Sequence, residues 1–262
     1  METIDHGRAL DWGNASADYA RYRSGYPTSF YDRLVGLGVA HPAHRILDLG
    51  TGTANLAREF ARRGCVVAGI DISEQQIAEA RRLAANENLQ IDFRVAPAEQ
   101  TGLPDHSFDV ITASQCWLYF DRDRVVSETK RLLAPVGRLM TCHMAWLPLR
   151  DPIAKQTEEL ILKYNPRWTA ANLTGHIPCR PSWIGEDFYV AGFFVYEELI
   201  PFTRETWRGR IRACRAIGGE LSRSETEKFD AEHASLLART VPDRFSVLHW
   251  LDAHILAPKS SS

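Results

Sequence analysis

The feature that most constrains the fold of this chain is a regular alternation of strand-like and helix-like segments between Arg45 and Met144. Short apolar runs predict strands at Arg45–Leu49, Val66–Asp71, Gln90–Val95, Phe108–Ala113 and Gly137–His143. Helical periodicity predicts helices between them at Thr53–Arg63, Ser73–Asn86 and Arg122–Leu133. Strands and helices that alternate with short connections are typical of a parallel sheet covered by helices, so we expect an α/β fold.

Two regions lie outside this alternation and predict a division into three parts. Residues 1–44 hold two helix-like stretches around a turn at Gly25–Pro27, and we expect a helical lid segment there. Residues 45–144 form the predicted core. Residues 145–262, with a helix near Ile153–Tyr164, are expected to provide a substrate cap or insertion and the last strands of the sheet. That region carries two further helix-like and two strand-like stretches, at 203–218, 222–240, 192–202 and 245–258.

Charge and cysteine content exclude several classes of function. The formal net charge of −2, with acids and bases interspersed, argues against a general electrostatic grip on nucleic acid. The five cysteines are scattered without a CxxC pair, which predicts neither a disulfide framework nor a metal site and fits the cytoplasm. Since no apolar window is long enough to span a bilayer and no signal core begins the chain, we expect no membrane association.

The turn after the first predicted strand has the composition of a ligand-binding loop. In RILDLGTGTANLAREFARRG, the residues Asp48, Gly50 and Gly52 stand at the carboxyl end of that strand, the edge where open parallel sheets bind ligands. The nicotinamide fingerprint GxGxxG requires a third glycine, and Asn55 occupies that position. A pyrophosphate site is therefore disfavoured.

The ends of the next two predicted strands carry groups that suit an adenosine ligand. Asp71 closes the second strand, 19 residues after Gly52, where a carboxylate can accept hydrogen bonds from both ribose hydroxyls. Ala98 and Glu99 follow the third strand, where a backbone amide and a polar side chain could bind an adenine edge. These positions favour a nucleoside-bearing cofactor.

The segments DLGTGT, GIDIS and VAPAEQTGLPDHSFDVITASQCWLYFD together resemble the class I S-adenosylmethionine-dependent methyltransferases. The resemblance is greatest to the small-molecule branch, which includes the trans-aconitate, ubiquinone-pathway and many natural-product methyltransferases, and it extends from Ala15 to Leu149. It implies a Rossmann-like sheet of seven strands, mostly parallel with the last strand antiparallel. It further implies methyl transfer from S-adenosyl-L-methionine to oxygen, nitrogen or carbon of a small organic molecule, with S-adenosyl-L-homocysteine as product.

Two departures from the family pattern are present. Ala54 stands where the family usually has a third glycine, a change of a single methyl group. Leu118 and Tyr119 stand where relatives often carry His-Trp, which indicates a different substrate and argues against assuming a catalytic base shared with those relatives.

The resemblance implies a cofactor role for each matching position. The backbone around Gly50 and Gly52 would approach the methionyl part, with Asp48 beneath the loop. Asp71 would hold the ribose, and Ile72 would pack on the adenine face. Further cofactor contacts are expected from Tyr19, Arg23, Ala98, Glu99, Gln115 and Cys116. We expect the first two of these to share one helical face, because they are four residues apart.

The chemistry of the acceptor decides whether a base is needed. Methyl transfer from a sulfonium is an in-line displacement, which positioning and exclusion of water can accelerate. A neutral amine needs no base, whereas an alcohol, phenol or carbon acid usually does. His143, at the predicted carboxyl end of the fifth strand, and Tyr119 are the candidates, and the alternative for His143 is a structural histidine.

The substrate pocket is expected to draw on aromatic and basic residues. Tyr26, Trp117 and Trp146 could wall the site around the sulfonium, or could be ordinary core residues. Arg208 and Arg212, four residues apart on one predicted helix, could anchor a substrate carboxylate or phosphate. The alternative is that both arginines pair with nearby acids.

Three other functions remain as alternatives. The first is a module that binds S-adenosylmethionine without catalysis, which intact binding residues alone do not exclude. The second is a nucleic-acid methyltransferase, disfavoured by the mild acidity and by SQCW in place of an Asn/Asp-Pro-Pro-Tyr motif after the fourth strand. The third is a nicotinamide dehydrogenase, which Asn55 disfavours.

Overall fold

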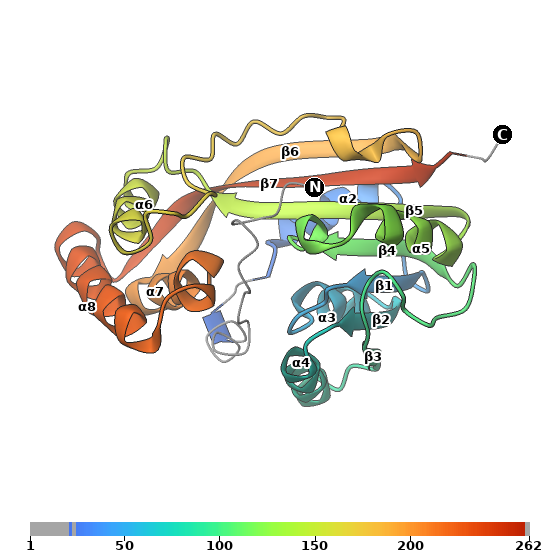
Figure 1. Cartoon of the computed structure of the whole chain (residues 1–262), viewed down its shortest axis with the longest axis horizontal. Coiled ribbons are helices and arrows are strands. Elements are labelled where there is room, and N and C mark those ends of the chain that lie inside the picture. The colour runs from blue at the N-terminus through green and yellow to red at the C-terminus, as the bar shows by residue number, and fades with distance from the viewer. Residues whose placement is uncertain (1–20, 23–24, 260–262) are drawn as a thin grey trace. The chain divides into compact units, whose positions relative to one another are not determined.

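The computed structural model describes residues 21–22 and 25–259, which fall into two compact units (Figure 1). Among the described residues, the core unit comprises 25–144, 177–196 and 251–259. The helical unit comprises the described residues 21–22, 145–176 and 197–250. Each unit has hydrophobic clusters of its own.

Seven strands form one sheet in the order β3-β2-β1-β4-β5-β7-β6. Their bounds are β1 Arg45–Leu49, β2 Val66–Asp71, β3 Ile91–Val95, β4 Phe108–Ser114, β5 Leu133–Trp146, β6 Phe188–Thr203 and β7 Arg244–Pro258. The pairs β1–β2, β1–β4, β2–β3 and β4–β5 are parallel. The arrowheads of β5 and β7 point in opposite directions in Figure 1, so the mostly parallel seven-stranded sheet with an antiparallel last strand is confirmed.

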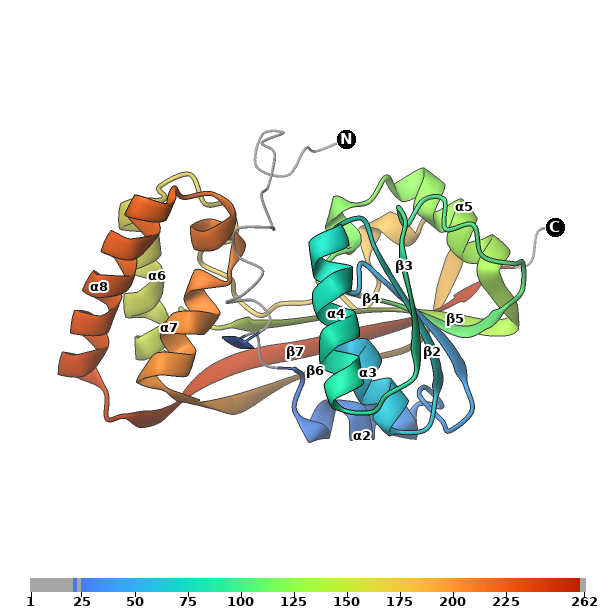
Figure 2. The ribbon, with the colours of Figure 1, turned by 90° about the horizontal axis from the view of Figure 1, so that it is seen from below.

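Helices cover both faces of the core unit's strands. They are α2 Thr28–Gly36, α3 Asn55–Arg62, α4 Glu74–Asn86 and α5 Arg122–Leu132, with short 3-10 turns η2 Trp117–Tyr119 and η3 Ser182–Ile184. Buried residues of α2, α3 and α4 share one hydrophobic cluster, and those of α5 and η3 share another. Figure 2 shows α2 and α3 on one side of the strands and α5 on the other. The order of the sheet reverses between β1 and β4, so the carboxyl ends of these strands form the expected ligand-binding edge.

The largest error in the predicted elements concerns β5. Pro135 and Gly137 indicate the end of a helix, so the strand is predicted to begin at Gly137. In the structure the strand begins at Leu133, directly after α5. Phe108 pairs with Leu133 and Val110 with Arg138, so two steps along β4 correspond to five along β5. A bulge therefore accommodates the proline within the strand.

The helical unit holds α6 Pro152–Tyr164, α7 Arg204–Arg212, a π-helical turn η4 Arg215–Gly219 and α8 Arg223–Thr240. The fully buried Trp207 is part of its hydrophobic cluster, and the indole nitrogen donates to Oγ1 of Thr157 at 3.0 Å. Nε2 of His233 lies 3.2 Å from the same hydroxyl. Burial lowers the pKa of His233 to about 4, so this histidine is a neutral core residue near neutral pH.

Asp151 connects the start of α6 to β7 within the helical unit. One carboxylate oxygen accepts from the backbone N–H groups of Ile153 and Ala154 at 2.8 and 2.9 Å, which makes Asp151 the N-cap of α6. The other oxygen accepts from the backbone N–H of Leu248 at 2.8 Å. Ser222 caps α8 in the same way, but at an exposed position.

We expect Asp151→Ala to lower the free energy of unfolding by about 2–4 kcal/mol, because three backbone donors lose a mostly buried acceptor. Ser222→Ala, the matched exposed cap, should cost only about 1 kcal/mol. Urea unfolding followed by circular dichroism measures both values. Equal losses in the two variants would contradict a special role for Asp151.

Asp48 is a buried acid beneath the turn that follows β1. Its side chain is 2% exposed, and its two oxygens accept from the hydroxyls of Thr51 at 2.7 Å and Thr112 at 2.5 Å. Burial raises the pKa of Asp48 from 3.8 to about 6, against the opposing effect of these hydroxyl donors, and the charge of Asp71 raises it further. The carboxyl group links β1, its turn and β4.

We expect Asp48→Asn to be more stable than the natural protein at neutral pH. A folded-state pKa above the unfolded value means that the stabilising contribution of Asp48 is complete below about pH 4 and is lost as the pH rises through about 6. The free energy of unfolding lost in this way is about 3 kcal/mol, and the variant does not lose it because an amide does not ionise. Urea unfolding at pH 4.5 to 8 should show the gain of the variant growing with pH. A gain that is independent of pH would contradict a raised pKa.

Candidate functional site

The turn between β1 and α3 has a backbone that only small residues can adopt. Gly50 has φ +60°, and a Cβ atom there would lie 2.9 Å from Sγ of Cys116. Gly52 also has positive φ, +56°. Ala54, at the position where the resembled family usually has glycine, has φ +63° as well. Its methyl group is fully buried. The left-handed backbone conformation costs a residue other than glycine about 1–2 kcal/mol.

Asp71 fixes this turn to the end of β2. Its Oδ2 accepts from the backbone N–H of Gly52 at 2.9 Å, and its Oδ1 accepts from that of Ser73 at 2.9 Å. Burial raises the pKa of Asp71, whereas hydrogen bonds from backbone N–H groups, those of Ser73 and Gly52 among them, oppose the rise. A carboxylate has about four acceptor positions, so Asp71 can still accept from a neighbouring hydroxyl group in addition to its backbone donors.

The positions predicted to contact an adenine differ in what they present. Ile72 is 77% exposed although it is large and apolar, which suits a residue that packs against a flat ligand. Ala98 is buried, so only its backbone is suited to contact a ligand. Oε1 of Glu99 accepts from the backbone N–H of Asp121 at 2.8 Å, next to the start of α5. The carboxylate of Glu99 therefore has a structural partner, and its role in binding adenine stays a prediction.

The residues after β4 are bonded to neighbouring strand ends. The backbone N–H of Gln115 donates to the carbonyl of Cys142 at 3.0 Å, and its side-chain amide donates to that of Met144 at 3.1 Å. Sγ of Cys116 donates to the carbonyl of Leu49 at 3.1 Å. Burial raises the pKa of Cys116 well above its ordinary value, so it is a neutral thiol. The side chains of Gln115 and Cys116 thus hold this loop against β5 and β1.

Aromatic residues predicted for the pocket lie at this end of the core unit. The hydroxyl of Tyr26 is 3.0 Å from Oγ of Ser114, the last residue of β4. Burial raises the pKa of Tyr26 well above its ordinary value. The ring of Trp117 lies 4.6 Å from that of Trp183, a partner that the sequence did not indicate. Tyr119 is 39% exposed.

His143 has a carboxylate partner that was not predicted from the sequence. Nδ1 of His143 lies 3.2 Å from Oδ2 of Asp252, which is fully buried, while 35% of the His143 side chain is exposed. Asp252 is an acid within the apolar run VLHWLDAHILAP, and this contrast is the signal that could have singled it out. The structure thus brings together His143 on β5 and Asp252 on β7.

Three predicted pocket residues belong to the helical unit. Trp146 is buried there, and its indole nitrogen donates to Oε2 of Glu158 at 3.2 Å. Nε of Arg208 and Nη1 of Arg212 lie 3.0 and 2.7 Å from Oδ1 of Asp230. Burial raises the pKa of Asp230, but the two arginines outweigh it and lower that pKa below its ordinary value. Both arginines therefore have an acidic partner, and their substrate role stays a prediction.

Two predicted cofactor residues, Tyr19 and Arg23, lie outside the described residues. Within the described part of the chain, no group of three His, Cys, Asp or Glu side chains could hold a metal ion. Among the helices that the structure describes, none has the length and apolar character to cross a membrane.

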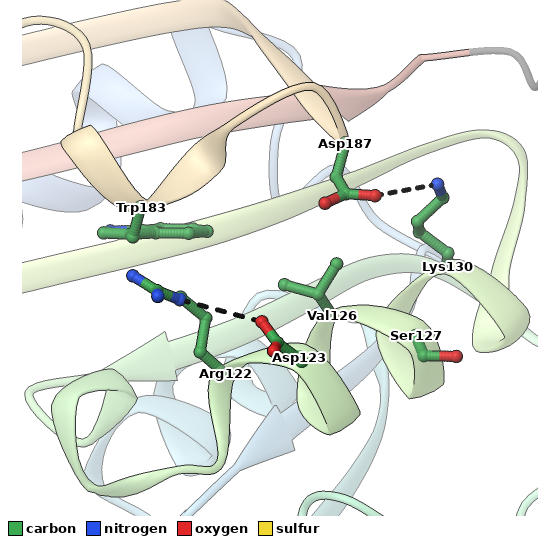
Figure 3. Close-up of a pocket in the computed structure, with 7 residues that line it drawn as sticks. All are labelled: Arg122, Asp123, Val126, Ser127, Lys130, Trp183 and Asp187. Carbon is green, nitrogen blue, oxygen red and sulfur yellow. Dashed lines mark hydrogen bonds and ion pairs between the residues drawn. The ribbon is translucent and has the colours of Figure 1, made fainter. Parts of the chain in front are cut away.

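A cavity of about 330 Å³ lies between α5 and the segment from η3 to Asp187 (Figure 3). Its lining contains none of the residues predicted to bind the cofactor. Nζ of Lys130 lies 3.1 Å from Asp187, and Nε of Arg122 lies 4.0 Å from Asp123, so positive and negative charges balance within it. The glycine turn is the better candidate site, because it combines a backbone free of side chains with a partly buried carboxylate and an exposed apolar residue.

Comparisons with known proteins agree with this geometry. Residues 47–141 match a family model described as a methyltransferase domain. An uncharacterized methyltransferase of Mycobacterium tuberculosis is 32% identical over 131 residues, which are 50% of this chain and 51% of that protein. The demethylmenaquinone methyltransferase of Thermus thermophilus is 38% identical over 111 residues, 41% of this chain and 50% of that protein. The chain thus spans about half the length of the curated relatives it matches.

A solved structure of a candidate type II methyltransferase from Anaeromyxobacter dehalogenans has the same fold, with a TM-score of 0.59. It is 23% identical, and the match covers 89% of this chain and 97% of that one. Residues 47–141 therefore resemble a methyltransferase domain, and the chain has the fold of a solved methyltransferase structure.

Proposed function

We propose that this chain transfers a methyl group from S-adenosyl-L-methionine to a small organic molecule. The observation that carries the proposal is the pair of hydrogen bonds from Gly52 and Ser73 to Asp71, beside the exposed Ile72. They hold a carboxylate with spare acceptor capacity at the edge of the sheet where α/β proteins bind ligands. A ribose diol and an adenine face match these two side chains.

The other cofactor contacts in this proposal come mainly from the backbone. The turn at Gly50 and Gly52 approaches the methionyl part with its backbone, since neither glycine carries a side chain. Asp48 supports the turn from below and does not contact the ligand itself. We assign Tyr19, Arg23, Ala98, Glu99, Gln115 and Cys116 to the surroundings of the cofactor, as the family resemblance implies. When bound, S-adenosylmethionine supplies an activated methyl group.

The proposed acceptor is a small molecule in the cytoplasm. The Thermus relative is named a demethylmenaquinone methyltransferase, which supports an organic molecule as the acceptor. The net charge of −2 supports neither DNA nor RNA as substrate. Tyr26 and Trp117 in the core unit and Trp146, Arg208 and Arg212 in the helical unit are the proposed pocket residues. His143 and Tyr119 are the proposed candidates for acid–base chemistry.

A module that binds S-adenosylmethionine without turnover is the second candidate function. It is favoured by the partners already held by Glu99, Gln115 and Cys116, because these side chains serve the fold. Formation of S-adenosylhomocysteine in the presence of acceptors distinguishes the enzyme from the module.

We expect Asp71→Ala to weaken the binding of S-adenosylmethionine about 10- to 100-fold, because a charged acceptor for the ribose is lost. Isothermal titration calorimetry measures the dissociation constant, and Asp71→Asn is the matched control that removes the charge but keeps one acceptor. The natural protein should not bind NAD. An unchanged dissociation constant in Asp71→Ala, or tight binding of NAD alone, would exclude the proposed site.

We expect Ile72→Ala to weaken S-adenosylmethionine binding about 3- to 10-fold through loss of apolar contact with the adenine. Since the side chain is 77% exposed, the free energy of unfolding without ligand should stay within about 0.5 kcal/mol of the natural value. Val136→Ala, which removes an equally exposed apolar side chain on β5, is the control and should leave binding unchanged. Equal affinity in both variants would remove Ile72 from the site.

A further inference from the structure

The contact between His143 and Asp252 fixes which nitrogen of the imidazole carries hydrogen. An ionised carboxylate only accepts hydrogen bonds, so Nδ1 of His143 donates to Oδ2 of Asp252 across 3.2 Å. In the neutral imidazole the lone pair is then on Nε2, at the far side of the ring. Asp252 is fully buried and His143 is partly exposed, so the donating nitrogen points into the protein.

His143 is held at the edge of the sheet that carries the candidate site. It stands between Cys142 and Met144, whose carbonyl groups accept from the backbone and the side chain of Gln115. The side chains of Cys142 and Met144 pack in the hydrophobic cluster shared with α2, α3 and α4. Because neighbouring side chains alternate along a strand, His143 projects from the opposite face of β5. That face carries the cluster of Ala98 and Trp117.

His254 stands on the other side of Asp252. Its Nε2 donates to the carbonyl of Pro178 at 2.8 Å, and its Nδ1 lies 3.6 Å from Oδ2 of Asp252. Burial lowers the pKa of His254, so at neutral pH this imidazole is neutral and carries its hydrogen on Nε2. The charge of Asp252 is therefore not neutralised by His254.

Two more titratable groups are affected by the charge of Asp252, namely Tyr26 and Cys142. Burial raises the pKa of both, that of Cys142 to about 12, so both are neutral near neutral pH. Of these neighbours, His143 contacts Asp252 through a ring nitrogen at hydrogen-bond distance, Nδ1 at 3.2 Å from Oδ2.

We propose that Asp252 positions His143 as a general base, so that the acceptor is an oxygen or carbon that loses a proton during methylation. In the step, Nε2 of His143 takes the proton from the acceptor O–H or acidic C–H. The electron pair left on that atom forms the bond to the methyl carbon, while the methyl–sulfur bond breaks and its electrons stay on sulfur. The products are the methylated acceptor, a neutral thioether and an imidazolium paired with Asp252. This inference rests on the proposed methyl transfer, whereas the positioning of His143 can be tested without turnover.

The positioning is tested by long-range ¹H–¹⁵N NMR on the full chain labelled with ¹⁵N-histidine, at a pH where imidazole is neutral. The chain has nine histidines, and loss of one signal in His143→Gln identifies the residue. We expect His143 to be the Nδ1–H tautomer in the natural protein. Asp252→Asn should keep this tautomer, because an amide oxygen at the position of Oδ2 still accepts from Nδ1 of His143.

In Asp252→Ala the tautomer should revert to a mixture. An Nε2–H tautomer in the natural protein, or a tautomer unchanged in Asp252→Ala, would overturn the positioning role. Thermal unfolding of each variant shows whether it is folded under these conditions. If Asp252→Ala is unfolded, the tautomer of His143 in the natural protein still tests the positioning role.

The role in catalysis is tested by formation of S-adenosylhomocysteine with phenol, catechol, acetylacetone and benzylamine as acceptors. We expect the rate of transfer to phenol, catechol and acetylacetone to fall at least 100-fold in His143→Gln. In Asp252→Ala the rate should fall about 10- to 100-fold. The rate in Asp252→Asn should lie between those of the natural protein and Asp252→Ala. The dissociation constant of S-adenosylmethionine should not change. Transfer to benzylamine alone, at a rate that His143→Gln does not change, would overturn the proposal that His143 acts as a general base. Failure of the natural protein to bind S-adenosylmethionine would instead refute the proposed function, and the NMR result on Asp252 would still hold.

Discussion

The carboxylate of Asp71 is the group on which the candidate site depends. It receives the backbone N–H of Gly52 from the turn after β1 and that of Ser73 from the start of α4. The turn is thereby fixed to the end of β2 although the backbone of Gly50 and Gly52 has no side chain to hold it. Asp48 supports the same turn from within, because it accepts hydrogen bonds from the hydroxyls of Thr51 in the turn and Thr112 on β4. One buried and one partly buried acid beside one turn make this edge negative, which suits a ligand that carries a sulfonium and an ammonium group.

The side chains around this edge divide into those that serve the fold and those that remain available to a ligand. Gln115 and Cys116 bond to carbonyl groups of β5 and β1, and Glu99 bonds to the backbone before α5. A cofactor at this edge is therefore recognised mostly by backbone geometry. Asp71 and Ile72 are the side chains that add chemical selectivity, one for a diol and one for a flat apolar surface.

Local patterns in the sequence predict most of the core unit, because its strands and helices are short and continuous. The predicted bounds of β1 and β2 agree with the structure residue for residue, and Ser73 is the N-cap of α4 as its spacing to Gln76 indicates. Pairings between distant segments could not be predicted in this way. Asp230 binds Arg208 and Arg212 from another helix, and the bulge at Pro135 depends on the register with β4. The predicted division into three parts remains a proposal.

The contact of His143 with Asp252 shows how the topology joins parts of the chain that no local pattern connects. The two residues are 109 positions apart, and they meet because β7 enters the sheet next to β5, between β5 and β6. β7 runs antiparallel to β5, and Asp252 lies in the middle of β7, so this residue meets His143 without closing a strand. Ligand-binding residues of a parallel sheet are expected at the carboxyl ends of its strands. This rule predicts His143 but does not predict Asp252. The buried acid in an otherwise apolar strand is the physical signal, because a carboxylate is retained there only where a donor compensates for its burial.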